Sequence, residues 1–205
     1  MWYYDVMFKK FVRKKIFILA GHPDSGERLN RSIAEAYARG AREGGHEVRR
    51  THLGELHFDP ILHKGYKVIQ TLEPDLVKAQ EDMKWADHIV IVYPNWWNTM
   101  PALLKGLFDR MFLPGFAFHF HKDKSHFWDK LLTGKTGRLI ISMDSPKFSD
   151  RIFFGDNTNE LRLGILGFAG IRPVRVTKIG GIKFLSREQI AMRLEKIYRL
   201  GKSAS

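Results

Sequence analysis

The sequence contains no cysteine, and that absence removes several classes of protein. Without thiols, the 205-residue chain cannot be a disulfide scaffold, bind zinc or an iron–sulfur cluster through cysteine, or catalyse a reaction with a thiolate. The chain also lacks an apolar run of about 18 residues, which is the length that a membrane-spanning helix needs. We therefore expect no transmembrane segment.

Acidic residues are scarce beside basic ones, since 22 Asp and Glu face 34 Lys and Arg, a net charge of +12. This balance favours phosphate-bearing partners, either nucleic acid or a nucleotide cofactor. Part of the charge lies in residues 1–14, which we expect to form a mobile basic arm, with docking on a membrane surface or a partner as the alternative. In this arm aromatic residues precede the basic ones, the reverse of a secretory signal. We expect a cytoplasmic protein.

Strand-like and helix-like patterns alternate along the rest of the chain. Short apolar runs predict strands, and apolar positions at helical spacing predict the helices between them. The predicted strands are 15–20, 46–53, 89–93, 138–142 and 174–179. The predicted helices begin at Leu29, at Thr71, at Thr99 with Pro101, at Asn157, and after the capping box of Ser186 and Gln189. Repeated strand–helix units imply one α/β domain over residues 15–200, a doubly wound, flavodoxin-like parallel sheet of order 2-1-3-4-5 with helices on both faces.

In such a sheet, ligands bind beside the carboxyl ends of the central strands. The first segment there, 21–30, leaves a strand and enters a helix, so its main-chain N–H groups can hold a phosphate. Arg28 and Asn30 add further donors. Asp24 and Glu27 would have to point outward, because they would repel a phosphate. An ordinary strand-to-helix loop with a cap is the alternative.

The second segment, 93–101, carries two tryptophans and two asparagines after the most apolar strand. So polar and aromatic a stretch is hard to explain as core packing. Trp96 and Trp97 could stack on a flat heteroaromatic ring whose edge the amides hydrogen-bond. The alternative is that both tryptophans pack beneath the loop.

Two further patterns, a histidine cluster and the excess of basic charge, say little about function. His119, His121 and His126 cluster with Asp123, but the phenylalanines between them favour an aromatic wall, and we expect no metal. The basic charge has no helix-turn-helix, zinc finger or basic heptad region beside it, so we expect no nucleic-acid partner.

Four stretches resemble the NAD(P)H:quinone oxidoreductase family, the flavodoxin-like group that contains DT-diaphorase, and the resemblance spans residues 15–200. They are GHP with RLN in the first loop, HFDPILHKGY at 57–66, YPNWWNTMPALLKGLFDRMF at 93–112 and LPGFAF at 113–118. The resemblance implies an enzyme whose flavin takes a hydride from NAD(P)H and then reduces a quinone in the same slot, by ping-pong kinetics. FMN is the expected flavin and FAD the alternative, because no C-terminal extension is evident to hold an adenine.

The resemblance also assigns roles to individual positions. It implies a homodimer in which the partner subunit completes the site, and the apolar helix at 101–113 would serve either that interface or the core. In the family, one loop holds the ribityl phosphate of the flavin, and the residues of this chain that match it are His22, Arg28, Leu29 and Asn30. The loop along the isoalloxazine edge matches Pro94, Asn95, Trp96, Trp97 and Asn98. The wall of the quinone and nicotinamide pocket matches Phe118 and Phe120.

The third loop departs from the family. Many relatives have T-T-G-G followed by a Tyr and a His that assist proton transfer, whereas this chain has SMDSPKF at 142–148, and Phe154 stands nearest to that His. We expect Ser145 and the main-chain N–H groups of 143–146 to stabilise the reduced flavin, with Asp144 facing away or capping the turn. We assign no catalytic residue.

Two other functions fit the same fold. One is an electron-carrying flavodoxin, although such carriers lack the G-F-A-F aromatic wall. The other is a regulatory flavoprotein subunit that docks on a protein partner such as a potassium-efflux system, for which the basic arm is suited.

Overall fold

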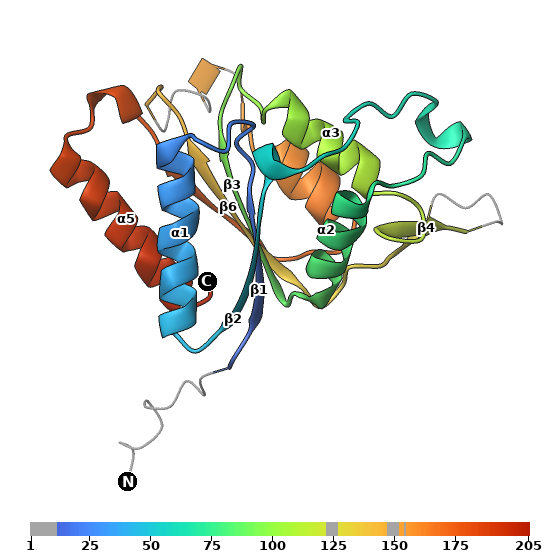
Figure 1. The fold of residues 1–205 in the computed structure, drawn as a ribbon, viewed down its shortest axis with the longest axis horizontal. Coiled ribbons are helices and arrows are strands. Elements are labelled where there is room, and N and C mark those ends of the chain that lie inside the picture. Colours follow the sequence, from blue (N-terminus) through green and yellow to red (C-terminus); the bar gives the residue numbers. More distant parts are fainter. Residues whose placement is uncertain (1–11, 122–126, 147–151, 154) are drawn as a thin grey trace, which may run out of the picture.

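Five parallel strands form the central sheet, in the order β2-β1-β3-β6-β7 (Figure 1). The structure is a computed structural model that describes residues 12–121, 127–146, 152–153 and 155–205, so most of the predicted basic arm lies outside the described residues. Counting only the strands of this sheet, the order is 2-1-3-4-5, and the predicted flavodoxin-like topology is confirmed. The strands are β1 (Lys15–Ala20), β2 (Glu47–His52), β3 (His88–Pro94), β6 (Thr136–Ser142) and β7 (Val174–Ile179).

Helices cover both faces of the sheet, with α1 and α5 on one face and α2, α3 and η3 on the other (Figure 1). Because side chains alternate along a strand, Phe17 and Leu19 of β1 join the core under α2 and α3, while Ile16 and Ile18 join the core under α1 and α5. This is why residues 16–20 of β1 and 89–92 of β3 are apolar without a break. The helices are α1 (Arg28–Glu43), α2 (Pro74–Trp85), α3 (Ala102–Met111), the π-helix η3 (Glu160–Gly167) and α5 (Arg187–Lys202).

Local signals explain most helix ends, but three predicted starts were wrong, one of them Asn157, because η3 begins at Glu160. α1 ends at Glu43 with Gly44 as its C-cap, and Gly45 takes a φ of 78°, which glycine adopts without steric cost. The capping box of α5 is present as predicted. However, α2 begins at Pro74, because a proline suits the first helical turn, rather than at Thr71. α3 begins at Ala102, so Thr99 belongs to the preceding loop.

Some elements were not predicted from the sequence. A two-stranded antiparallel hairpin joins β4 (Phe118–Phe120) to β5 (Trp128–Lys130) beside the main sheet. Three short 3-10 helices follow β2, the 57–64 loop and β7. Their bounds are η1 (Leu53–Glu55), η2 (Gly65–Lys67) and η4 (Ile182–Phe184). Among the described residues, no helix combines the length and apolar character needed to cross a membrane.

Candidate functional site

The carboxyl ends of β1, β3 and β6 bring the three predicted loops to one edge of the sheet. β1 and β6 flank β3, with Ala20 opposite Val92 and Pro94 opposite Ser142. Two main-chain hydrogen bonds then join each loop to the neighbouring strand, because Gly21 N donates to the Val92 carbonyl of β3 at 2.7 Å and Asn95 N donates to the Ser142 carbonyl of β6 at 2.8 Å. The segments that sequence reasoning selected are therefore neighbours in space.

The first loop is held by its own hydrogen bonds. Asp24 N donates to His22 Nδ1 at 3.0 Å, and Gly26 N donates to the Asp24 carboxylate at 2.8 Å. The imidazole of His22 also meets the indole of Trp96 edge-on, with ring centroids 5.4 Å apart. The first and second loops thus contact each other through two predicted site residues.

Glu27 occupies the N-terminus of α1. Its two carboxylate oxygens accept from Leu29 N and Asn30 N, each at 2.7 Å. Glu27 is therefore a helix cap, as the alternative for this loop expected, because the unpaired N–H groups and positive end of the helix attract its carboxylate. The outward position was expected only beside a bound phosphate, and it stays a prediction. Arg28 begins the helix, but its side chain is not among those described.

Asn30 connects the end of the first loop to strand β6. Its side chain is buried, and its Oδ1 accepts from Ser142 Oγ at 2.9 Å. The neighbouring Leu29 is half-buried and packs against the core beneath α1. The first turn of α1 is therefore anchored to the end of β6 as well as to its own core.

The second loop is a tight turn closed by reciprocal main-chain hydrogen bonds between Trp96 and Thr99, at 2.9 and 3.0 Å. Its central residues, Trp97 and Asn98, have φ values of 51° and 64°, a conformation that non-glycine residues adopt at a cost. Trp97 is 99% exposed, so the alternative of packing beneath the loop is wrong for this side chain. Thr99 Oγ1 donates to the Glu160 carboxylate of η3 at 2.5 Å.

The third loop places Asp144 beside a basic partner that the sequence did not indicate. Lys183 Nζ in η4 lies 2.7 Å from the Asp144 carboxylate, so the acidic side chain next to the site is offset by a positive one. Gly181 N donates to the Ser145 carbonyl at 3.0 Å, which fastens the loop to the end of β7. Met143 N already donates a hydrogen bond to the Ile179 carbonyl at 2.9 Å. Residues 147, 148 and 154 lie outside the described residues.

The pKa of Tyr93 reflects the negative charges at this edge of the sheet. Burial raises the pKa of its phenol, and the carboxylates of Glu160 and Asp156 raise it further. The phenol therefore stays protonated at neutral pH. Glu160 of η3 therefore acts on the second loop in two ways, through its contact with Thr99 and through its charge near Tyr93. No local signal in the sequence links Glu160 to this loop.

Phe118 and Phe120 lie apart from these loops. They line an apolar groove of ≈ 640 Å³ between α3, β4 and η3, which also includes Tyr66 and Phe168. The loops that carry Trp96, Trp97 and Asp144 contribute none of the described residues that line it. Among the described residues, the predicted aromatic wall and the predicted flavin loops therefore do not share this groove.

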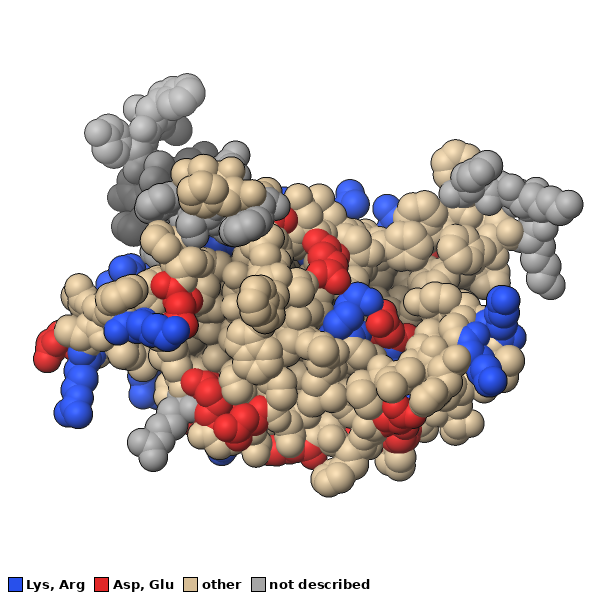
Figure 2. All heavy atoms as spheres, turned by 90° about the horizontal axis from the view of Figure 1, so that it is seen from above, with Lys and Arg blue, Asp and Glu red and all other residues tan. Residues whose placement is uncertain are grey.

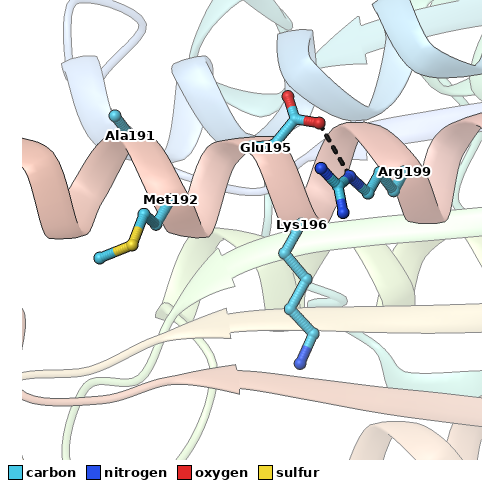
Figure 3. A pocket seen from close by; sticks show the side chains of 5 residues that line it. All are labelled: Ala191, Met192, Glu195, Lys196 and Arg199. Carbon is cyan, nitrogen blue, oxygen red and sulfur yellow. Dashed lines mark hydrogen bonds and ion pairs between the residues drawn. The ribbon is translucent and has the colours of Figure 1, made fainter.

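A second hollow follows the outer face of α5 and is lined by Ala191, Met192, Glu195, Lys196 and Arg199 (Figure 3). All five come from that one helix, and Glu195 is already paired with Arg199 at 2.8 Å. This hollow does not combine groups from several elements, as a binding site does. The carboxyl edge of the sheet is the stronger candidate.

The histidine cluster is only partly described. His121 Nε2 lies 3.1 Å from the Asp129 carboxylate, whereas His126 and Asp123 lie outside the described residues. Within the described part of the chain, no group of three or more His, Asp or Glu side chains could hold a metal ion.

Comparisons with known proteins agree with this geometry and with the resemblance predicted from the sequence. A family model described as a flavodoxin-like fold matches residues 14–200. An uncharacterized NAD(P)H oxidoreductase of Haemophilus influenzae is 29% identical over 175 residues, covering 82% of this chain and 84% of that protein. NAD(P)H dehydrogenase (quinone) 1 of Rattus norvegicus is 26% identical over 218 residues, covering 91% and 78%. The crystal structure of Smu.1420 from Streptococcus mutans UA159 is 28% identical and has a TM-score of 0.77, with 91% of this chain and 98% of that chain covered.

Proposed function

Because this chain belongs to the flavodoxin-like family, we propose that it is a flavin-dependent NAD(P)H dehydrogenase that reduces quinones or related acceptors. The observation that carries the proposal is Trp97, whose fully exposed indole is held at positive φ on the carboxyl edge of the sheet. A large aromatic side chain in an uncommon backbone conformation, left in solvent, suits a platform for a planar ring. The relatives named NAD(P)H oxidoreductase and NAD(P)H dehydrogenase (quinone) support the choice of donor and acceptor.

The residues at this edge fit a phosphorylated flavin. At the N-terminus of α1, two N–H groups already hold a carboxylate, so they are directed to bind an oxyanion. At the other end, the turn at 96–99 would contact the ring system through Trp96, Trp97 and the amide of Asn98. Pro94 and Asn95 set the position of that turn, since β3 ends there and Asn95 N is fixed to β6.

When bound, the flavin supplies the hydride chemistry, and the protein supplies binding and polarity. In the third loop, Met143 N is engaged and Pro146 has no N–H, so Asp144 and Ser145 would provide the main-chain donors toward the reduced ring. Lys183 reduces the repulsion that Asp144 would otherwise exert on negative charge there. Donor and acceptor would use one slot in turn, which gives ping-pong kinetics. We propose FMN as the flavin and the cytoplasm as the location.

We also propose a homodimer, because the aromatic wall and the flavin loops lie apart in one chain. Phe120 is 54% exposed and Tyr66 is 67% exposed on the rim of the groove. Apolar side chains exposed together in this way are typical of an interaction surface. In the dimer, the exposed Phe120 of one copy would face the flavin loops of its partner. Phe118 is only 8% exposed and packs edge-on against Phe120, so it would support this wall from the core.

The first test is spectroscopic. Purified protein is expected to be yellow or to become yellow with FMN, to lose the colour with NADH or NADPH, and to regain it with a quinone. Trp97→Ala is expected to weaken FMN binding by about five- to tenfold, because a stacked aromatic contact is lost. Fluorescence titration of the apoprotein measures this change.

Met192→Ala is the matched control, since Met192 is also apolar and 64% exposed but lies on the outer face of α5. It should leave FMN binding unchanged. A protein that binds neither FMN nor FAD would overturn the proposal. Reduction by an electron-transfer protein, but by neither nicotinamide, would instead favour an electron carrier.

A further inference from the structure

We propose that Glu27 is a built-in competitor for the flavin phosphate at the N-terminus of α1, an inference that rests on the proposed function. The carboxylate is bound at both oxygens, one to Leu29 N and one to Asn30 N, each at 2.7 Å. These are short, charge-assisted hydrogen bonds at the positive end of a helix. A phosphate group would use the same donors and the same helix end.

The carboxylate and a phosphate cannot share this position. Each N–H group makes one strong hydrogen bond, and two anions in contact repel each other. A phosphorylated flavin would therefore bind only if the Glu27 side chain leaves both N–H groups. Glu27 is half-buried, with its main chain extended, so rotation of the side chain alone would release the donors.

The surroundings leave the side chain as the part that moves. The buried Asn30 is hydrogen-bonded to Ser142 of β6, which fixes the first turn of α1 to the sheet. The loop before the helix is equally confined by Gly54, where an added Cβ would lie 2.1 Å from the Pro23 carbonyl oxygen and 2.8 Å from Ser25 N. Because these contacts hold the helix and the loop in place, we assign the movement to the Glu27 side chain.

Binding of a phosphorylated flavin is thus an exchange of one anion for another. The hydrogen bonds that the phosphate gains are offset by those that Glu27 loses, so the phosphate adds little to the affinity of the wild-type protein. Riboflavin lacks the phosphate and would leave Glu27 in place. The ratio of the FMN affinity to the riboflavin affinity therefore measures the competition directly.

The experiment compares apoprotein variants by quenching of tryptophan fluorescence with FMN and with riboflavin. Glu27→Gln keeps the size of the side chain and removes its charge. It is expected to raise FMN affinity about tenfold, the factor that corresponds to ~1.4 kcal/mol, and to leave riboflavin affinity within about twofold. Glu43→Gln is the matched control, because it makes the same charge change at the other end of α1, where Glu43 accepts from the Tyr198 hydroxyl.

Glu27→Ser provides a second variant, because serine is a common N-cap and leaves room for a phosphate. It should shift the affinity ratio in the same direction as Glu27→Gln. Parallel changes for both flavins, or a loss of FMN affinity in both variants, would overturn the inference while leaving the proposed function intact. If the wild-type protein and every variant bound neither flavin, the proposed function would fail, and the inference with it.

Discussion

His88 is a titratable side chain buried at the start of β3. Its Nδ1 lies 2.7 Å from Thr136 Oγ1, and its buried Nε2 has no hydrogen-bond partner among the described residues. Burial lowers the pKa of His88 to about 3, and the positive charges of Lys14, Arg138 and Arg175 contribute to the shift. The folded protein therefore keeps this imidazole neutral at all but strongly acidic pH.

His88 makes the stability of the fold depend on pH. In the unfolded chain the imidazole has a pKa of about 6.5, so below that pH the unfolded state binds a proton that the folded state refuses. The free energy of unfolding should be unaffected by His88 above that pH and should fall as the pH drops toward 3. Urea unfolding of His88→Gln should therefore lose about 2 kcal/mol less between pH 7.5 and pH 5 than the wild type does. The pKa values of His46 and His52 are also lowered, but both histidines are present in both proteins, so equal losses would refute the assignment to His88.

Single residues of the site differ in how far the sequence could predict them. Trp97 could be selected because an aromatic residue in a polar loop after a buried strand is unusual. The position of Glu27 could not, since a sequence does not show whether a carboxylate repels a ligand or takes its place. The ion pair of Asp144 with Lys183 could not be predicted either, because η4 approaches the third loop only through its position after the end of β7 in the folded sheet.

The turn at 96–99 depends on the π-helix η3. Reciprocal main-chain hydrogen bonds close the turn, and the Thr99 hydroxyl connects it to Glu160 at the start of η3. Trp97 and Asn98 keep their positive φ values at an energetic cost, so contacts outside the turn are needed to hold them. The Thr99–Glu160 contact is one such contact.

Thr99→Val removes the hydroxyl and nearly preserves the shape of the side chain. We expect it to lower the free energy of unfolding by about 0.5–1 kcal/mol, because an exposed hydrogen bond to a charged group is lost. If the proposed function holds, it should also raise the dissociation rate of FMN, since the turn that would contact the ring is less well held. Glu160→Gln retains an acceptor oxygen for Thr99 and should stay close to the wild type. Wild-type stability and FMN release in Thr99→Val would show that the main-chain hydrogen bonds hold the turn alone.

At the scale of elements, periodic patterns predicted the five main strands, their order and most helices. β4 and β5 were not predicted, because each has only three residues, too few for an alternating pattern to be recognised. The start of α2 was misplaced because Thr71 is a good capping residue by itself, whereas the Pro74 that follows fits the first helical turn better. The sequence of η3 predicts a helix, but its π-helical hydrogen bonding depends on tertiary packing.

The net charge of +12 does not produce a uniformly basic site. Figure 2 looks onto the carboxyl edge of the sheet, where carboxylates lie across the face, some of them beside basic side chains. In the third loop, Asp144 is paired with Lys183 at 2.7 Å. An anionic cofactor would therefore depend on particular donors at this edge more than on the overall field of the protein.

At the scale of the whole molecule, the groove between α3, β4 and η3 tests the proposed dimer. Its rim exposes Phe120, and burying that ring against a second copy would stabilise association. Light scattering after size-exclusion chromatography should give the wild type twice the mass of one chain. Phe120→Asp should shift the measured mass to that of one chain. Because the partner's wall would be lost, it should also reduce quinone turnover at least about tenfold while FMN binding persists.

Met192→Asp introduces the same charge on the outer face of α5 and should remain dimeric. A wild-type monomer that turns over quinone would mean that Phe118 and Phe120 act in another way, and a dimer unaffected by Phe120→Asp would place the interface elsewhere.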